Sequence, residues 1–156
     1  MSSMIETVTG GSDGVGAAAQ LLHDFNLEYD EPSPPPDELA GRLAELIEQD
    51  QVVVLVAGAE GEPVGVAAMR VQPSLWSEAS EAYLAELYVV PDRRGQGFGR
   101  ELITEAIRVA RDRGADYAFL ITSEHDQLAQ RLYEAAGFRR TEGEGGPLML
   151  AYEQDL

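Results

Sequence analysis

Residues 90–102, VPDRRGQGFGREL, place three glycines within five positions, between an apolar run and a helical pattern. Glycine loses more backbone entropy on folding than any other residue, so such a cluster indicates a special conformational demand. A loop that leads from a strand into a helix presents unpaired backbone N–H groups and the positive end of the helix dipole to an anion. No Gly-Lys-Ser/Thr follows, as in a P-loop, and Arg100 stands where a dinucleotide fingerprint has its third glycine. The stretch therefore predicts a pyrophosphate cradle of another type, the alternative being an ordinary glycine-rich turn.

The chain is strongly acidic, with 28 Asp and Glu against 11 Lys and Arg and a net charge of −17. Most of such a surface repels a phosphate backbone or an anionic membrane, so we expect neither nucleic acid nor a membrane as partner. Cysteine is absent and the two histidines lie far apart, so we expect no metal site. Six of the cations lie on the glycine stretch and the helix after it: Arg93, Arg94, Arg100, Arg108, Arg111 and Arg113.

Length and composition predict one domain over residues 1–156, because 156 residues with 44% hydrophobic side chains suffice for one sizeable core. No apolar run approaches the roughly 18 residues that cross a bilayer. The N-terminus also lacks the basic and apolar regions of a signal peptide. We therefore expect a cytoplasmic protein.

The periodicity predicts an α/β (α+β) chain with a mixed sheet of about six to seven strands and about four helices. A proline-rich segment, residues 28–38, separates the first two helices, and Asp37 is expected to cap the second. Residues 117–122 are largely apolar, as for a strand buried on both faces. The helices are expected over 15–25, 38–49, 101–114 and 127–136, and the strands over 4–9, 52–58, 64–71, 83–90, 117–122, 138–141 and 147–152.

Two motifs resemble the GCN5-related N-acetyltransferases. Residues 94–99, RGQGFG, fit the family's Arg/Gln-x-x-Gly-x-Gly/Ala signature between its fourth strand and third helix. Residues 126–138, DQLAQRLYEAAGF, resemble its second signature at Ala129, Leu132, Tyr133, Glu134, Gly137 and Phe138, with Asp126 where Asn is common. The resemblance implies a single-domain fold of that family, splayed between strands four and five.

The resemblance also implies acetyl-coenzyme A as co-substrate, with its pyrophosphate on residues 95–100 and its pantetheine arm paired with the fourth strand like an added strand. A backbone N–H of that strand, most simply that of Val89, would bind the oxyanion. The implied cofactor-binding residues are Leu87, Tyr88, Val89, Arg94, Gly95, Gln96, Gly97, Phe98, Gly99, Arg100 and Asp126.

Two side chains are the catalytic candidates. Tyr133 matches the family tyrosine that reprotonates the coenzyme sulfur, although it could equally fill the apolar stripe of its helix. Glu86 interrupts an apolar strand and is the candidate base, the alternative being a solvated glutamate paired with an arginine. A water relay from Glu81 stays open, and Ile121 stands where some relatives carry a glutamate. Neither His23 nor His125 is favoured as a catalyst.

These features together predict an acetyl-CoA-dependent N-acetyltransferase that works by direct attack in a ternary complex on a primary amine, with a cationic small molecule favoured as acceptor. The resemblance implies that the segment joining the first two helices walls the acceptor pocket, and residues 24–50 carry nine acids there. Phe25, Glu28 and Tyr29 are the candidate substrate-binding residues. A non-catalytic acyl-CoA sensor and an acetyltransferase for protein N-termini or lysines are the alternatives. A homodimer is also expected as one option.

Overall fold

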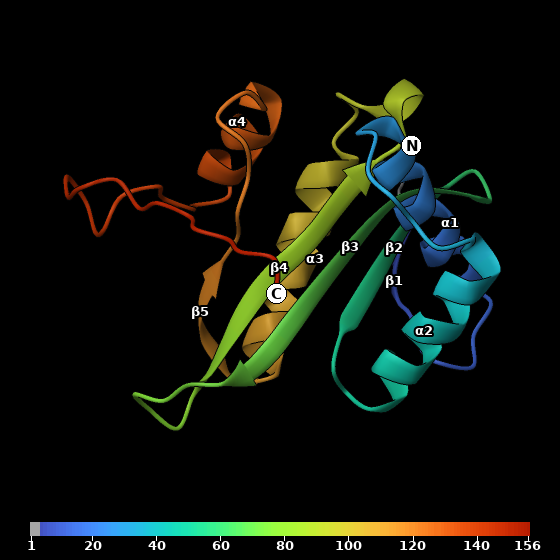
Figure 1. Ribbon diagram of the computed structural model, residues 1–156, viewed down its shortest axis with the longest axis horizontal. Helices are drawn as coiled ribbons and strands as arrows, with labels where there is room; N and C mark the ends of the chain where they lie inside the picture. The colour runs from blue at the N-terminus through green and yellow to red at the C-terminus, as the bar shows by residue number, and fades with distance from the viewer. Residues whose placement is uncertain (1–3) are drawn as a thin grey trace.

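A computed structural model describes residues 4–156 as one five-stranded sheet with α-helices packed on both faces (Figure 1). The strands lie in the order β1-β2-β3-β4-β5, antiparallel except for the parallel pair β4 and β5. None of the helices described is long and apolar enough to cross a membrane. The elements are β1 (Met4–Thr7), α1 (Gly14–Glu28), α2 (Pro36–Glu48), β2 (Val53–Ala59), β3 (Glu62–Pro73), β4 (Ser80–Val89), the 3₁₀ turn η1 (Pro91–Arg93), α3 (Phe98–Asp112), β5 (Ala115–Phe119) and α4 (Gln127–Ala135).

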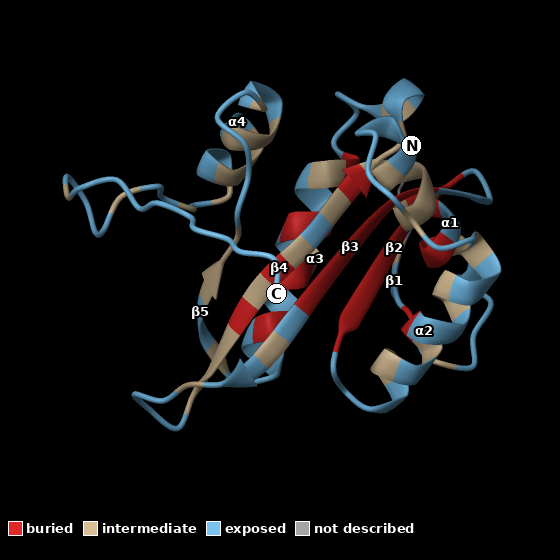
Figure 2. Ribbon diagram, in the orientation of Figure 1, coloured by how far each residue is buried: buried red, intermediate tan, exposed pale blue. Residues whose placement is uncertain are grey.

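Helices α1 and α2 cover one face of the sheet and α3 covers the other. Strand β2 is buried on both faces because its side chains alternate between the two layers. Val53 and Leu55 point into the α3 layer, whereas Val54 and Val56 point into the α1 and α2 layer. The buried residues therefore concentrate in β2, β3 and the middle of α3 (Figure 2).

The sheet opens between β4 and β5, as the resemblance implies. The two strands pair only from Ser80 to Tyr83 of β4, and β4 continues to Val89 without a partner on that edge. Strand β5 ends at Phe119, so the rest of the β4 edge, up to Val89 before the glycine-rich residues 94–99, has no strand beside it.

A β-bulge at Ala85 changes which face the second half of β4 presents. Met69 of β3 pairs with Leu84 and Ala68 pairs with Glu86, so Ala85 has no partner in the register. An extra residue reverses the in-and-out alternation beyond it. Leu84 accordingly packs in the α3 layer, whereas Tyr88, also an even position, packs in the α1 and α2 layer. Glu86, two residues before Tyr88, turns to that same layer.

The predicted number of strands was too high. Residues 138–141 and 147–152 form no strands, and only an isolated bridge joins Thr141 to Leu148. Consequently β5 is an edge strand, shorter than residues 117–122 and half exposed, so the prediction that it is buried on both faces was wrong.

Helix α2 begins earlier than predicted. Pro35 is its N-cap residue, and no side chain caps the helix, so Asp37 is not the cap. Pro36 occupies the first position, where its fixed φ suits a helix and its missing N–H costs nothing. Asp37 and Glu38 lie in the first turn and favour the helix through the dipole instead.

Candidate active site

The glycine loop (residues 94–99) joins η1 to α3 and offers backbone donors without side chains in the way. Gly95 and Gly97 have φ values of +76° and +95°, and a Cβ at either position would meet nothing within 4 Å. Helix α3 has no side-chain cap, and its first hydrogen bond runs from the Glu101 N–H to the Gly97 carbonyl at 3.0 Å. The N–H groups of residues 98–100 are thus free of intrahelical partners. This arrangement fits a pyrophosphate group.

Side chains around the glycine loop add positive charge to it. Arg93 lies 3.6 Å from Glu60 and 6.0 Å above the ring of Phe98, and it reaches Gln96 at 3.4 Å. Arg100 is exposed and makes no ion pair within residues 4–156. Phe98 itself is buried, so it anchors the helix and contributes its backbone N–H to the loop.

The open edge of β4 presents backbone groups at Leu87 and Val89. The N–H of Val90 donates to Val64 of β3 at 2.9 Å, and neighbouring residues of a strand point their backbone groups to opposite sides. The Val89 N–H therefore faces the opening beside β4. Its carbonyl faces the same way and accepts a hydrogen bond from Arg94 Nε at 2.9 Å. This edge can pair with an extended ligand as another strand would.

The three predicted substrate-binding residues meet at the end of α1. The ring of Phe25 stacks on Tyr88 of β4 with centroids 5.1 Å apart, and Tyr29 meets Phe25 edge-on at 5.4 Å. Glu28 is 2.9 Å from Arg94, the first residue of the glycine loop. The structure thus brings the three residues together at the end of α1, where Phe25 contacts β4 and the Glu28 carboxylate forms an ion pair with Arg94 of the glycine loop.

Glu86 lines a cavity of about 140 Å³ on the α1 and α2 side of the sheet. The carboxylate stays open to solvent, yet desolvation by the surrounding protein raises the pKa of Glu86 above its ordinary value, and the charge of Arg70 lowers it in part. The remaining lining residues come from α1, the proline segment and α2: Leu22, Asn26, Ser33, Pro34 and Leu39. A carboxylate among apolar walls and two neutral polar side chains suits an amine.

The proline segment between α1 and α2 is held over this cavity by hydrogen bonds from α1. His23 Nδ1 lies 3.0 Å from Ser33 Oγ and 2.9 Å from the Pro34 carbonyl. Asn26 Nδ2 donates to the Pro32 carbonyl at 2.8 Å. The role of His23 is therefore to fix the wall of the cavity.

Tyr133 of α4 is the second titratable group of the candidate site. Burial, together with the negative charges of Asp126, Glu86 and Tyr29, raises the pKa of Tyr133 to about 12. The hydroxyl therefore stays protonated at neutral pH and can act as a proton donor. Its ring also packs against the core and meets Phe138 edge-on at 6.2 Å, so the predicted structural role is present as well.

The other sequence candidates lie in less suitable places. Asp126 is the N-cap of α4, and its Oδ1 accepts a hydrogen bond from the Ala129 N–H at 3.1 Å. His125 and Ile121 are exposed. Glu81 lies at the start of β4, five residues or about 17 Å from Glu86. Within residues 4–156 no three His, Asp or Glu side chains are arranged to hold a metal ion.

Sequence reasoning missed Leu22, Asn26, Ser33 and Leu39 as cavity residues. Leu22 and Asn26 lie four positions apart and so share a helix face, which was readable from the sequence. This face lies toward Glu86 because the bulge at Ala85 turns Glu86 to the α1 and α2 side. The sequence gives no signal for that bulge.

A glycine loop that suits a pyrophosphate, an open strand edge, and the titratable side chains of Glu86 and Tyr133 are features that suit an acyltransferase site of the coenzyme A type. Residues 18–138 match the family model "Acetyltransferase (GNAT) family", and the chain belongs to this family. It is an acetyltransferase.

Related sequences and a solved structure agree with this family assignment. An uncharacterized N-acetyltransferase of Bacillus subtilis, YhfO, is 32% identical over 81% of this chain and 86% of its own length. A thialysine N-epsilon-acetyltransferase of Bos taurus is 34% identical over 60% of this chain but only 58% of its own length. A crystal structure from Arthrobacter sp. FB24, of a protein assigned as an acetyltransferase, superposes with a TM-score of 0.87 at 38% identity, over 98% of this chain and 96% of that one.

Proposed function

We propose that this enzyme transfers the acetyl group of acetyl-coenzyme A directly to the primary amine of a cationic small molecule. The observation that carries the proposal is that Glu86, an acid with a raised pKa beside a cavity, lies near enough to Tyr133 for its charge to help raise the pKa of that hydroxyl. A base for the amine and a proton donor for the thiolate are both groups that the reaction requires.

Each residue has a defined task in this scheme. When bound, acetyl-coenzyme A supplies a thioester that is already activated for attack. The N–H groups at the start of α3 bind its pyrophosphate, and the exposed edge of β4 pairs with its pantetheine arm. The Val89 N–H donates to the thioester carbonyl oxygen, where negative charge develops.

Proton movement completes the scheme. Glu86 accepts a proton from the acceptor ammonium, which leaves the neutral amine free to attack, and its raised pKa lies nearer to the working pH than that of an ordinary glutamate. The Tyr133 hydroxyl donates a proton to the departing thiolate, and the phenolate regains a proton from the acylated nitrogen, which must lose its second proton to become the amide. No covalent bond to the enzyme is needed, and the chain has no cysteine to form one.

A small cationic acceptor is favoured by the cavity and by two relatives. Its walls combine Leu22, Leu39 and Pro34 with the Glu86 carboxylate, which suits a short apolar body that ends in an ammonium. The thialysine enzyme of Bos taurus and a streptothricin acetyltransferase of Streptomyces lavendulae, 33% identical over 61% of this chain, are both named for small-molecule acceptors.

Release of coenzyme A thiol from acetyl-coenzyme A, measured with polyamines, amino acids, aminoglycosides and peptides, tests the proposal. The chain contains no lysine, so acetylation of enzyme side chains does not obscure the signal. We expect thiol release with small diamines and little with peptides or neutral amines. Coenzyme binding without thiol release from any amine would favour the sensor function, and a preference for peptides would favour a protein acetyltransferase.

Glu86→Gln and its matched control Glu81→Gln identify the base. We expect Glu86→Gln to lower kcat most at low pH, where the acceptor is protonated, and Glu81→Gln to leave kcat within about twofold, since Glu81 lies about 17 Å away along β4. The reverse pattern would assign the base to Glu81.

A further inference from the structure

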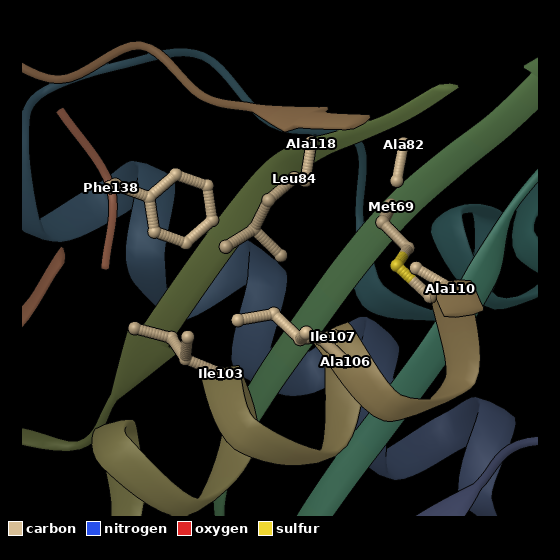
Figure 3. A pocket seen from close by; sticks show the side chains of 9 residues that line it. All are labelled: Met69, Ala82, Leu84, Ile103, Ala106, Ile107, Ala110, Ala118 and Phe138. Atoms are coloured by element: carbon tan, nitrogen blue, oxygen red, sulfur yellow. The ribbon is translucent and has the colours of Figure 1, made fainter. Parts of the chain in front are cut away.

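Arg70 of β3 lies on the same face of the sheet as Glu86, the proposed base. Figure 3 shows its neighbour Met69, with Leu84 of β4, in an apolar pocket of nine side chains between α3 and the sheet. Neighbouring residues of a strand point to opposite faces, so Arg70 turns to the α1 and α2 side. Glu86 turns to that side as well, because of the bulge at Ala85. A cation therefore shares the acceptor face of the sheet with the base.

Arg70 and Glu86 lie close to each other but do not form an ion pair. Glu86 pairs with Ala68 of β3, and Arg70 follows Ala68 by two positions. Diagonal neighbours of this kind lie roughly 7–8 Å apart. The charge of Arg70 reaches Glu86 and lowers its pKa in part, yet no salt bridge within residues 4–156 includes Arg70. The guanidinium thus keeps its donors for another group.

Cations are rare in the part of the chain that forms the acceptor face. Residues 4–92 contain two arginines, Arg42 and Arg70, and no lysine. Arg42 lies 3.5 Å from Glu45 on the surface of α2. Arg70 is exposed, and no aromatic ring of residues 4–156 lies against its guanidinium. A negatively charged ligand group on this face therefore finds one arginine without an ion pair.

The sheet surface around Arg70 is open. Gln72 lies on the same face of β3 and is exposed. Tyr117 of β5, next to the pocket residue Ala118, turns to this face too and is 53% exposed. Figure 2 accordingly shows exposed and intermediate residues at this end of β3. A ligand can therefore lie along the sheet from Glu86 to Arg70, whereas all nine side chains that line the pocket on the α3 face are apolar.

The order of the groups along β3 and β4 matches the reaction. Val89, the proposed oxyanion donor, pairs with Gly65 of β3, and Glu86 pairs with Ala68. Arg70 lies beyond Glu86, on the side away from Val89. The acceptor amine must lie close to both the thioester carbonyl and the base. The rest of the acceptor then extends away from the coenzyme, toward Arg70.

We propose that Arg70 binds a carboxylate of the acceptor, so that the substrate is a diamino carboxylic acid acetylated on the amine far from its carboxylate. This inference rests on the proposed function, of which it names the substrate class. The guanidinium fork matches a carboxylate in a bidentate pair. The second amine keeps the molecule cationic, as the acidic surface favours. A spacing of roughly 7–8 Å fits about four or five carbon atoms between the carboxylate and the reacting amine, as in ornithine and lysine.

L-Lysine and cadaverine form a matched pair of acceptors, because cadaverine is lysine without its carboxylate. The acidic surface alone favours the doubly charged cadaverine over lysine, which carries a single net positive charge. We nevertheless expect kcat/KM in wild type to be roughly tenfold higher for lysine, since a charge-assisted pair holds its carboxylate. Arg70→Gln should abolish this preference. Arg42→Gln removes an equal charge from α2 and should keep the preference.

Binding of the same two molecules is measured without turnover, from the rise in Tm that each gives in the presence of coenzyme A. We expect lysine to raise Tm more than cadaverine does in wild type and in Arg42→Gln, but not in Arg70→Gln.

The outcomes separate this inference from the proposed function. A preference for cadaverine in wild type, or a lysine preference that Arg70→Gln retains, would overturn the carboxylate site and leave acetyl transfer standing. A preference for lysine in binding, without thiol release from any amine, would overturn acetyl transfer and leave the carboxylate site standing. Neither thiol release nor a rise in Tm with lysine would overturn both.

Discussion

Arg94 Nη2 donates to both carboxylate oxygens of Glu28, at 2.9 Å each, while Nε of the same guanidinium donates to the Val89 carbonyl at 2.9 Å. The first residue of the glycine loop is thereby bound to the end of α1 and to the open edge of β4. Its guanidinium also lies 5.6 Å from the ring centroid of Tyr88. Sequence reasoning assigned Arg94 to the coenzyme and Glu28 to the acceptor, and the structure joins the two by an ion pair.

We therefore predict that Arg94 and Glu28 are energetically coupled. In a double-mutant cycle, Arg94→Ala and Glu28→Ala should be non-additive in the KM for acetyl-coenzyme A, with a coupling of about 0.5–1 kcal/mol because the pair is partly exposed. The matched pair Arg93→Ala and Glu60→Ala, 3.6 Å apart, should show less coupling. Additive effects of Arg94→Ala and Glu28→Ala would mean that the loop and α1 act independently.

Gly97→Ala should reduce the thermal stabilisation that acetyl-coenzyme A gives the protein. A ligand that binds only the folded state raises Tm by mass action, so the shift reports binding. An alanine at positive φ costs roughly 1–2 kcal/mol of stability wherever it stands. Gly61→Ala, in the β2–β3 turn with φ of +84° and equal open space, carries that cost without touching the glycine loop and should keep the full ligand-induced shift. An equal shift in both variants would make the loop an ordinary turn.

Tyr133→Phe should lower kcat by roughly 10²-fold and leave the KM for acetyl-coenzyme A within about twofold, because only the proton donor is removed. With the pKa of Tyr133 raised to about 12, the wild-type rate should show no alkaline loss from this group below about pH 10. Tyr83→Phe is the control, since its ring stacks on Phe119 where β4 and β5 are paired. Unchanged turnover in Tyr133→Phe would leave this residue a packing role alone.

Glu86→Gln should raise Tm at neutral pH, and the gain should vanish as the pH falls. Desolvation raises the pKa of Glu86 in the folded state, so the folded protein bears a cost for the charged carboxylate that is present above the folded pKa. Below the unfolded value, near pH 4.5, the carboxyl is protonated in both states and glutamine offers no advantage. A stabilisation that is the same at pH 4 and pH 7 would contradict the raised pKa.

Much of the fold was predictable because its signals are local. The β-branched run of β2, the apolar stripe of α3 and the glycine loop between β4 and α3 each follow from neighbouring residues. The C-terminal strands were predicted wrongly, since residues 138–141 and 147–152 have strand-like composition but lie in no strand of the sheet, which ends at β5. Propensity alone does not place a segment in a sheet.

The candidate site also has parts that local sequence predicts and parts that it does not. The glycine loop and Tyr133, the proposed proton donor, lie within short motifs and were identified from them. The cavity around Glu86 depends on a bulge at Ala85 and on hydrogen bonds from Asn26 and His23 to the proline segment, which join residues distant in sequence. The pairing of Glu28 with Arg94 spans 66 positions and leaves no local trace.

The acidic side chains of residues 24–50 lead to the last prediction, that the KM of a cationic acceptor rises steeply with salt. Ion pairs neutralise three of the nine acids in residues 24–50, namely Glu28, Glu45 and Asp50. The other six leave a net negative field that attracts an ammonium over distances that salt controls. The Debye length falls from about 30 Å at 0.01 M salt to about 8 Å at 0.15 M.

The test measures KM for the best diamine across this range of salt in wild type and in two double variants. Asp37→Asn/Glu38→Gln changes the start of α2, and Glu142→Gln/Glu144→Gln removes two charges from the C-terminal segment. We expect the α2 variant alone to flatten the salt response, because Asp37 and Glu38 lie next to Leu39 of the cavity lining, whereas Glu142 and Glu144 lie in the C-terminal segment. A flat response in wild type, or a preference for neutral or anionic amines, would show that these acids merely solvate the surface.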